Sequence, residues 1–149
     1  MINKIAMQQY CLNLVAEKLK STKEEMNLTK EASFEETKSS AGDKFETGRE
    51  MMQQEADKFA RQIEELNKIY RLIDSLNLNK TSEKIEAGSI VKTNQNVFFI
   101  SASLGMVEFE GEKLMLISAI SPIASALLNK KAGDQLTFNG RTYIVEEVY

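Results

Sequence analysis

Residues 37–43 read TKSSAGD, a run of small and polar residues that contains one glycine. This composition is typical of a turn. Apolar residues recur every seven positions on both sides of the run: Ile5, Leu12, Leu19 and Met26 before it, and Phe45, Met52, Phe59, Leu66 and Ile73 after it. A sustained seven-residue repeat predicts two helices that pack along a coiled-coil seam.

The two repeats fit the arms of an antiparallel hairpin. The facing pairs are Ile5 with Ile73, Leu12 with Leu66, Leu19 with Phe59, and Met26 with Met52. Every pair is centred on residue 39, inside the run that has the composition of a turn. We therefore predict an antiparallel coiled-coil hairpin over residues 1–77, folded back within one chain, with its tip near residues 37–43.

The sequence pattern changes after residue 77. We assign residues 78–86 to a linker and residues 87–149 to a β-rich domain, because short strand-like runs alternate there with turn signals such as Asn139-Gly140. Pro122 opens one short helical segment within this part. The predicted fold class is α+β, with a helical hairpin followed by a small β-rich domain that carries one short helix.

Composition excludes several function classes. The net charge of the chain is −3, so a nucleic-acid binder held by phosphate contacts is not expected. The chain has one cysteine and no histidine, which removes an internal disulfide, the usual zinc sites and the Ser-His-Asp triad. We expect Cys11 to be a packing residue. No stretch resembles a signal peptide or a membrane span, so we expect a cytoplasmic protein without membrane contact.

One long stretch carries a family resemblance. Residues 120–134 read ISPIASALLNKKAGD. They resemble the C-terminal signature of the bacterial GreA/GreB transcript-cleavage factors, roughly S-P-L-G-x-A-L-L-G-K-K-x-G-D, which is followed by a strand, a turn and a last strand. Here Leu136–Phe138, Asn139-Gly140 and Tyr143–Val148 supply those elements. The resemblance covers residues 118–148 in sequence and residues 1–77 in architecture.

The resemblance implies a fold and a partner. In that family the C-terminal domain is FKBP-like, with the fold of a prolyl isomerase, and docks beside the secondary channel of RNA polymerase, which the coiled coil enters. It implies that Ser121, Pro122, Lys130 and Lys131 contact the polymerase. A structural alternative exists for each: Ser121 caps a helix that Pro122 begins, and the two lysines complement the dipole at the helix end.

The tip of the hairpin is implied to act on the polymerase's own chemistry. Family tips read roughly D-x-x-E-N-A-[DE]-Y, and their acids help the polymerase to hold a second Mg²⁺ and position a water for RNA cleavage. By resemblance, Glu36 and Asp43 would assist cleavage, and Glu35, Glu36 and Asp43 would share the Mg²⁺. Alternatively, Glu35 and Glu36 only end the first helix, and Asp43 caps the second.

The sequence departs from the family pattern at this tip. One alignment places Glu36 and Ser39 at the two acidic positions, and another places Lys38 and Ala41 there, so at least one acid is lost in either. This departure leaves open a channel binder that modulates or inhibits transcription without cleavage.

Two further classes stay open. One is a coiled-coil interaction protein unrelated to transcription. The other is a prolyl isomerase with an aromatic pocket, although the aromatic residues at alternate positions fit a sheet core more simply: Phe98, Phe99, Phe109, Phe138 and Tyr143. We expect no enzymatic activity of its own and no cofactor beyond the shared Mg²⁺. The expected partner is RNA polymerase, with nucleic acid contacted only inside that complex. We expect a monomer, with weak dimerisation as the alternative.

Overall fold

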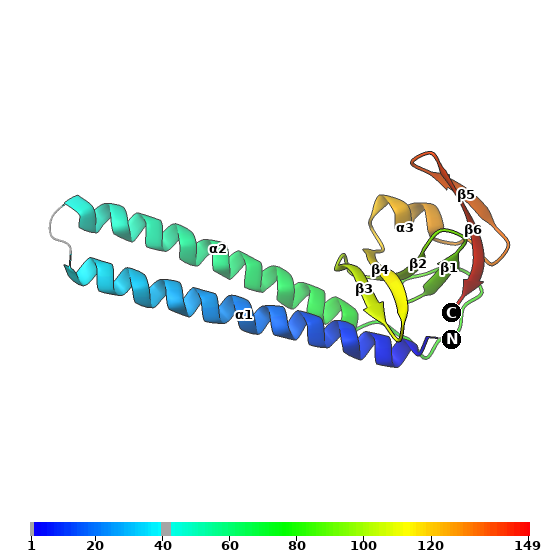
Figure 1. The fold of residues 1–149 in the computed structure, drawn as a ribbon, viewed down its shortest axis with the longest axis horizontal. Helices are drawn as coiled ribbons and strands as arrows, with labels where there is room; N and C mark the ends of the chain where they lie inside the picture. Colours follow the sequence, from blue (N-terminus) through cyan, green and yellow to red (C-terminus); the bar gives the residue numbers. More distant parts are fainter. Residues whose placement is uncertain (1, 40–42) are drawn as a thin grey trace. The chain divides into compact units, whose positions relative to one another are not determined.

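The computed structural model of the chain describes the backbone of residues 2–39 and 43–149, and the side chains of residues 2–32 and 48–149. Two long helices come first and a six-stranded sheet follows, with a short helix between its fourth and fifth strands (Figure 1). The elements are α1 (Lys4–Ser39), α2 (Asp43–Asp74), β1 (Ile90–Thr93), β2 (Val97–Ser101), β3 (Gly105–Phe109), β4 (Glu112–Ser118), α3 (Pro122–Leu127), β5 (Gln135–Phe138) and β6 (Arg141–Val148).

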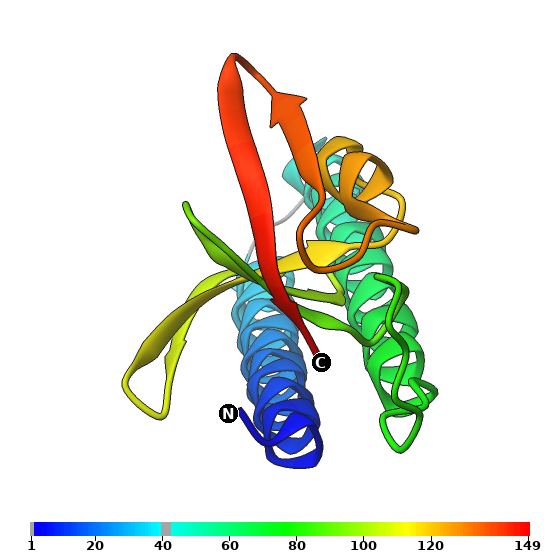
Figure 2. The same cartoon turned by 90° about the vertical axis from the view of Figure 1, so that its right-hand side faces the viewer.

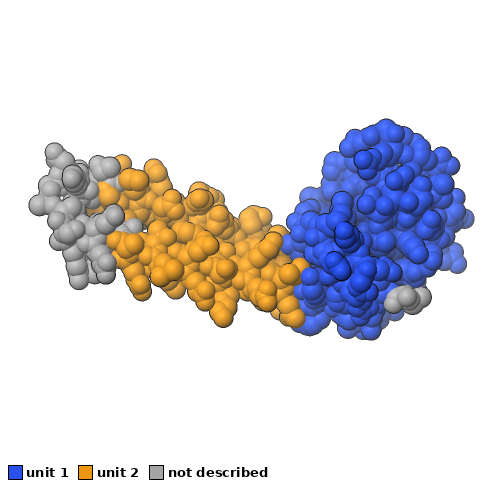
Figure 3. All heavy atoms as spheres, in the orientation of Figure 1, with its two compact units in different colours: residues 1–11, 72–149 blue, residues 12–71 orange. Residues whose placement is uncertain are grey.

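The chain forms two compact units, coloured separately in Figure 3. The hairpin unit is Leu12–Arg71, and the sheet unit combines Met1–Cys11 with Leu72–Tyr149. Both long helices therefore contribute residues to both units. None of the helices in the part of the chain that the structure describes is long and apolar enough to cross a membrane.

The seam of the hairpin unit follows most of the predicted repeat. Leu12 and Phe59 are buried, and the other repeat residues that the structure describes in this unit are half-buried: Leu19, Met26, Met52 and Leu66. Val15, between two repeat positions, is fully buried. The seven-residue spacing thus identifies the buried stripe of each helix.

The prediction that Ile5, the first residue of the repeat, is buried in the seam is wrong. Ile5 is 58% exposed, whereas Met7 and Cys11 are completely buried. Ile5 lies in the part of α1 that belongs to the sheet unit, Met1–Cys11, where Met7 and Cys11 are the buried positions.

The sheet has the strand order β3-β4-β2-β1-β6-β5. β2 and β4 are parallel, with Val97 against Leu114 and Ser101 against Ser118, and all other neighbouring strands are antiparallel. Figure 2 shows the β5–β6 hairpin at one end of the sheet. Its turn is Asn139-Gly140, as predicted, and both residues have positive φ angles, 50° and 75°.

One hydrophobic core joins α3 to the sheet. Ala124 and Leu127 of α3 pack in a cluster with buried side chains from five of the strands: Val91, Phe98, Ile100, Ile117, Leu136, Tyr143 and Val145. The rings of Phe98 and Tyr143 lie 6.1 Å apart. Phe99, between Phe98 and Ile100, is also fully buried. Central strand β2 is thus buried on both faces, which explains its continuous apolar run.

The first residues of the chain belong to the sheet unit. Asn3 caps α1, because its Oδ1 accepts from the backbone N of Ile5 and Ala6 at 3.0 and 3.1 Å. Lys4 Nζ donates to the backbone O of Tyr149 at 3.1 Å, and burial lowers the pKa of this ammonium group. The ring of Tyr10 lies 5.2 Å from that of Phe109 on β3. The two ends of the sequence therefore meet in one folded unit.

The predicted fold class is confirmed. Two helices precede a mixed sheet with one short helix, and the strands of that sheet all lie within residues 87–149, where the sequence predicted a β-rich domain.

Candidate functional site

Ser121 fixes the turn before α3. Its Oγ donates to the backbone O of Ser118 at 2.7 Å and accepts from the backbone N of Ala124 at 3.3 Å. Pro122 occupies the first helical turn, where a missing N–H costs no helical hydrogen bond. The structural interpretation of both residues is therefore confirmed: Ser121 is the N-cap of α3 and Pro122 begins it.

Three further positions of the 120–134 stretch are explained by backbone geometry. Asn129 has a φ of 69°, a left-handed conformation that asparagine tolerates better than most residues. The resembled signature has glycine at this position, and glycine satisfies the same requirement. Gly133 has a φ of 94°, and Asp134 Oδ2 accepts from the backbone N of Lys131 at 2.9 Å. Much of the resemblance thus encodes a helix with defined ends.

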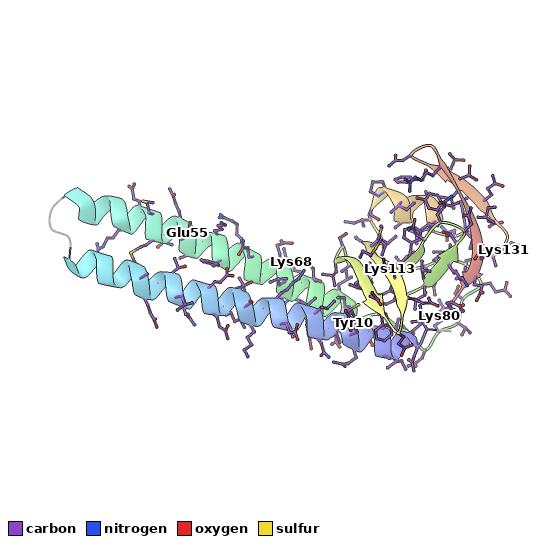
Figure 4. The ribbon with its side chains drawn as sticks, viewed as in Figure 1. Tyr10, Glu55, Lys68, Lys80, Lys113 and Lys131 are labelled. Carbon is purple, nitrogen blue, oxygen red and sulfur yellow. The ribbon has the colours of Figure 1, made fainter. Side chains whose placement is uncertain are left out.

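Lys130 and Lys131 are not explained in this way. Lys130 follows Leu127, the last residue of α3, by three positions, and its backbone N donates to Leu127 O at 3.1 Å, so its role as a helix-end cation and its role as a contact residue both stay predictions. The backbone O of Lys130 accepts from Ile85 N at 2.8 Å, and Lys131 is exposed (Figure 4). Neither ammonium group forms an ion pair with any residue that the structure describes. Both remain candidate contact residues.

Ile120 is a candidate that the sequence analysis missed. Its side chain is 91% exposed, although the backbone is held by a 3.2 Å hydrogen bond from Ile120 N to Ser118 Oγ. A hydrophobic residue directly before an N-cap commonly packs against the fourth helical residue. That residue is Ser125, which is polar and exposed. The sequence therefore contained a signal for the exposure of Ile120: an apolar residue precedes the N-cap, and the fourth helical residue is not apolar.

The predicted tip acids lie where the structure gives no side chains. Glu35 and Glu36 belong to the backbone of α1, and Asp43 is the first residue of α2, but their side chains are outside the described residues. Among the residues that are described, no three His, Cys, Asp or Glu side chains gather closely enough to hold a metal ion. The role of the tip acids stays a prediction.

The aromatic side chains of the sheet unit are packing residues. Phe98, Phe99 and Tyr143 are buried, Phe138 packs against the same core, and Phe109 contacts Tyr10. This arrangement confirms the interpretation as sheet core for Phe98, Phe99, Phe138 and Tyr143, whereas Phe109 packs against α1.

Cys11 is a buried thiol. Its side chain is completely inaccessible, and burial raises its pKa from 9.0 to about 11. Because a thiolate is the reactive form of cysteine, this shift keeps the side chain inert at neutral pH. The prediction of a packing role for Cys11 is confirmed.

Comparison with known proteins finds similarity among solved structures but not among protein families or curated proteins. No protein-family model matches the chain, and no curated protein matches it. Among solved structures, that of the transcription factor Gfh1 is similar, with 22% sequence identity over 93% of this chain and 93% of that chain. The TM-score is 0.37, a value at which the similarity carries no argument about function.

Proposed function

We propose that this protein is a Gre-type factor that binds RNA polymerase at the secondary channel and acts on backtracked complexes. The observation that carries the proposal is the resemblance of residues 120–134 to the GreA/GreB signature, downstream of a long helical hairpin. The signature and the hairpin support the proposal only together, because a helical hairpin alone also fits unrelated interaction proteins. The chain assists the polymerase and performs no reaction of its own.

We expect the docking residues to be those whose side chains neither pack in the core nor form an ion pair within the described part of the chain. We assign this role to Ile120, Lys130 and Lys131, and Ser121 and Pro122 hold the turn beside Ile120 in shape. An exposed isoleucine on a fixed backbone is a preorganised anchor, because little conformational entropy is lost when it is buried by a partner. Burying such a side chain is worth roughly 1.5–3 kcal/mol.

The tip acids supply the second half of the function. Glu35, Glu36 and Asp43 carry carboxylate oxygens, which are the ligands that Mg²⁺ prefers. The Mg²⁺ would belong to the polymerase, where a second metal ion activates water and stabilises the leaving oxygen. The chain's own part is to bring negative charge to that metal ion.

A second candidate function follows from the tip sequence. Lys38 and Lys44 interleave with the acids, and at least one acidic position of the family tip is lost. Both differences weaken the negative field available to a metal ion. They favour a factor that occupies the channel and modulates or inhibits transcription without stimulating cleavage.

The first experiment measures binding of the full chain to core RNA polymerase from the same source, in competition with a known Gre factor. We expect competitive binding, and Ile120→Ser should weaken it about tenfold or more, because roughly 1.4 kcal/mol corresponds to a factor of ten. The matched control is Ile144→Ser, since Ile144 is another exposed isoleucine, 42% accessible, on β6. Absence of binding at low salt would contradict the proposal and favour a coiled-coil protein unrelated to transcription.

A second experiment separates the two candidate functions. The double variant Glu36→Ala/Asp43→Ala should bind the polymerase as the parent does, and RNA cleavage in backtracked complexes is compared with Mg²⁺ present. A loss of stimulated cleavage in the variant supports the cleavage factor. An absence of stimulation by the parent supports the modulator. A loss of binding in the variant would show that the tip is a docking element.

A further inference from the structure

A shallow groove of about 740 Å³ runs along one flank of the hairpin unit. Leu14 and Lys18 line it from α1, and Lys58, Arg61 and Leu66 line it from α2. The lining residues stand at positions 14, 17, 18, 21 and 22 of α1 and at positions 58, 61, 62, 65 and 66 of α2, the three- and four-residue spacing of one helix face. The groove is therefore a continuous feature of the two-helix surface.

The floor of the groove is apolar. Leu14 and Leu66 are half-buried, and each leaves part of its side chain accessible from the groove. The methylene stems of Lys18, Lys58 and Arg61 extend this surface while their charged groups stay in water. The floor is accordingly wider than the two leucines alone would make it.

The rim of the groove carries three cationic side chains, Lys18, Lys58 and Arg61, against two carboxylates, Glu17 and Glu65. Lys18, Lys58 and Arg61 form no ion pair with any residue in the described part of the chain. The carboxylate four residues after Arg61 is that of Glu65, and its Oε1 instead contacts Lys68 Nζ at 3.4 Å. The neighbouring Glu64 contacts Arg71 at 3.6 Å.

This positive rim contrasts with the rest of the protein. The whole chain has a net charge of −3. Lys58 and Arg61 are three positions apart on one helix, a spacing at which like charges repel each other. An anionic partner relieves that repulsion.

We propose that this groove binds an acidic amphipathic α-helix of a partner protein, which packs on the hairpin as a third helix. An apolar stripe on the partner would cover Leu14 and Leu66, and flanking carboxylates would pair with Lys18, Lys58 and Arg61. The groove extends from residue 14 to residue 22 on α1, about 12 Å at 1.5 Å per residue, which matches two turns of a partner helix.

A nucleic acid fits the same groove less well. Single strands bind through bases that stack on aromatic side chains, and none of the residues that line the groove is aromatic. The proposal does not depend on RNA polymerase binding, because no candidate docking residue lies in the groove.

The test uses the full chain and a labelled synthetic peptide as the probe. The peptide is about 20 residues long, with Leu at positions i, i+3, i+4 and i+7 and Glu on both flanks, and binding is followed by fluorescence anisotropy. We expect saturable binding that weakens with salt. The double variant Lys58→Glu/Arg61→Glu should lower the affinity at least tenfold, and Leu14→Ser should lower it severalfold.

The matched control is Lys20→Glu/Lys23→Glu, which makes the same charge change at two exposed α1 lysines outside the groove. The control should stay within about twofold of the parent, and circular dichroism checks that every variant keeps its helices. Equal losses in the two double variants would overturn the proposal in favour of general charge attraction. A single-stranded oligonucleotide that binds more tightly than the peptide, and is insensitive to Leu14→Ser, would overturn it in favour of nucleic acid.

Discussion

At the scale of single residues, backbone conformation explains which side chains the chain accepts in its tight turns. Outside glycine, Glu110, Asn129 and Asn139 are the described residues with positive φ angles, at 52°, 69° and 50°. Asparagine adopts this left-handed conformation readily, whereas for most residues it costs roughly 1–2 kcal/mol. Asparagine therefore suits two of the three positions, whereas glutamate is poorly suited to position 110.

We predict that Glu110→Asn stabilises the protein. Glu110 and Gly111, with φ angles of 52° and 80°, form the turn between β3 and β4, and Asn-Gly is the preferred pair for such a turn. The free energy of unfolding should rise by about 0.5–1 kcal/mol in urea denaturation. The reciprocal variant Asn139→Glu, in the turn that already reads Asn-Gly, should lower it by a similar amount. An unchanged midpoint in both variants would contradict this explanation.

The buried Cys11 predicts a dependence of stability on pH. Burial raises the pKa of the thiol from 9.0 to about 11, so the folded state keeps a proton that the unfolded state releases. The stability that this contributes is fully present below pH 9 and is lost as the pH rises towards 11. Urea denaturation at pH 8, 9, 10 and 11 should show a smaller decline for Cys11→Ala than for the parent. Lys4 is present in both the parent and Cys11→Ala, so its contribution to the pH dependence of stability cancels when the two are compared.

At the scale of the elements, the hairpin seam is less well filled towards its tip than at its base. Leu12, Val15 and Phe59 are buried, whereas Met26 and Met52 are half-buried and line a cavity of about 310 Å³. Thr29 and Ala56 line the same cavity. A small residue and a polar residue at inward positions leave a gap that the two flexible methionine side chains fill only in part.

We predict that Ala56→Leu strengthens the hairpin. A larger apolar side chain would fill part of the cavity without displacing well-packed neighbours, and cavity filling commonly adds about 0.5–2 kcal/mol. The matched control is Ala60→Leu, because Ala60 is exposed and lies outside the cavity. Amide hydrogen exchange along residues 48–60 should slow in Ala56→Leu and stay unchanged in Ala60→Leu. Faster exchange in Ala56→Leu would show that the seam is already filled.

At the scale of the whole molecule, the sheet unit depends on both ends of the chain. The unit contains Met1–Cys11, and Tyr10 contacts Phe109 while Lys4 bonds to Tyr149. Gln8 Nε2 donates to the backbone O of Ile73 at 2.8 Å. The segment of α1 and the segment of α2 that belong to the sheet unit therefore lie next to each other. A short loop could replace the hairpin between them.

We predict that a chain in which a short Gly-Ser loop replaces residues 12–71 folds cooperatively. Its thermal midpoint should exceed that of the fragment 78–149, because the fragment exposes Phe109 and loses the contacts of residues 2–11. Thermal unfolding followed by circular dichroism makes the comparison. Equal midpoints would show that residues 78–149 are the independent folding unit.

The sequence predicted well wherever a local rule governs the structure. The strand-like runs after residue 86, the Asn139-Gly140 turn and the Ser121 cap each depend on residues close in the chain, and each is present. The repeat also identified Leu12 and Phe59 as seam residues. It failed at Ile5, in the part of α1 that belongs to the sheet unit and not to the hairpin unit.

The candidate site was less predictable, because exposure depends on what the rest of the chain covers. The pattern around the N-cap Ser121 hinted at Ile120, but no local pattern marks Lys18, Lys58 and Arg61 as neighbours around one groove. The side chains of Glu35, Glu36 and Asp43 lie outside the described residues, so their role still stands on the resemblance alone.

By itself, the sequence determined the two periodicities, the turns and the helix caps of this protein, since each is set by interactions between residues close in the chain. Only the tertiary structure decided that residues 2–11 fold with the sheet, that β2 lies parallel to β4, and which apolar and charged side chains stay uncovered. The physical reason is that these features result from burial between segments far apart in sequence, which no local pattern encodes.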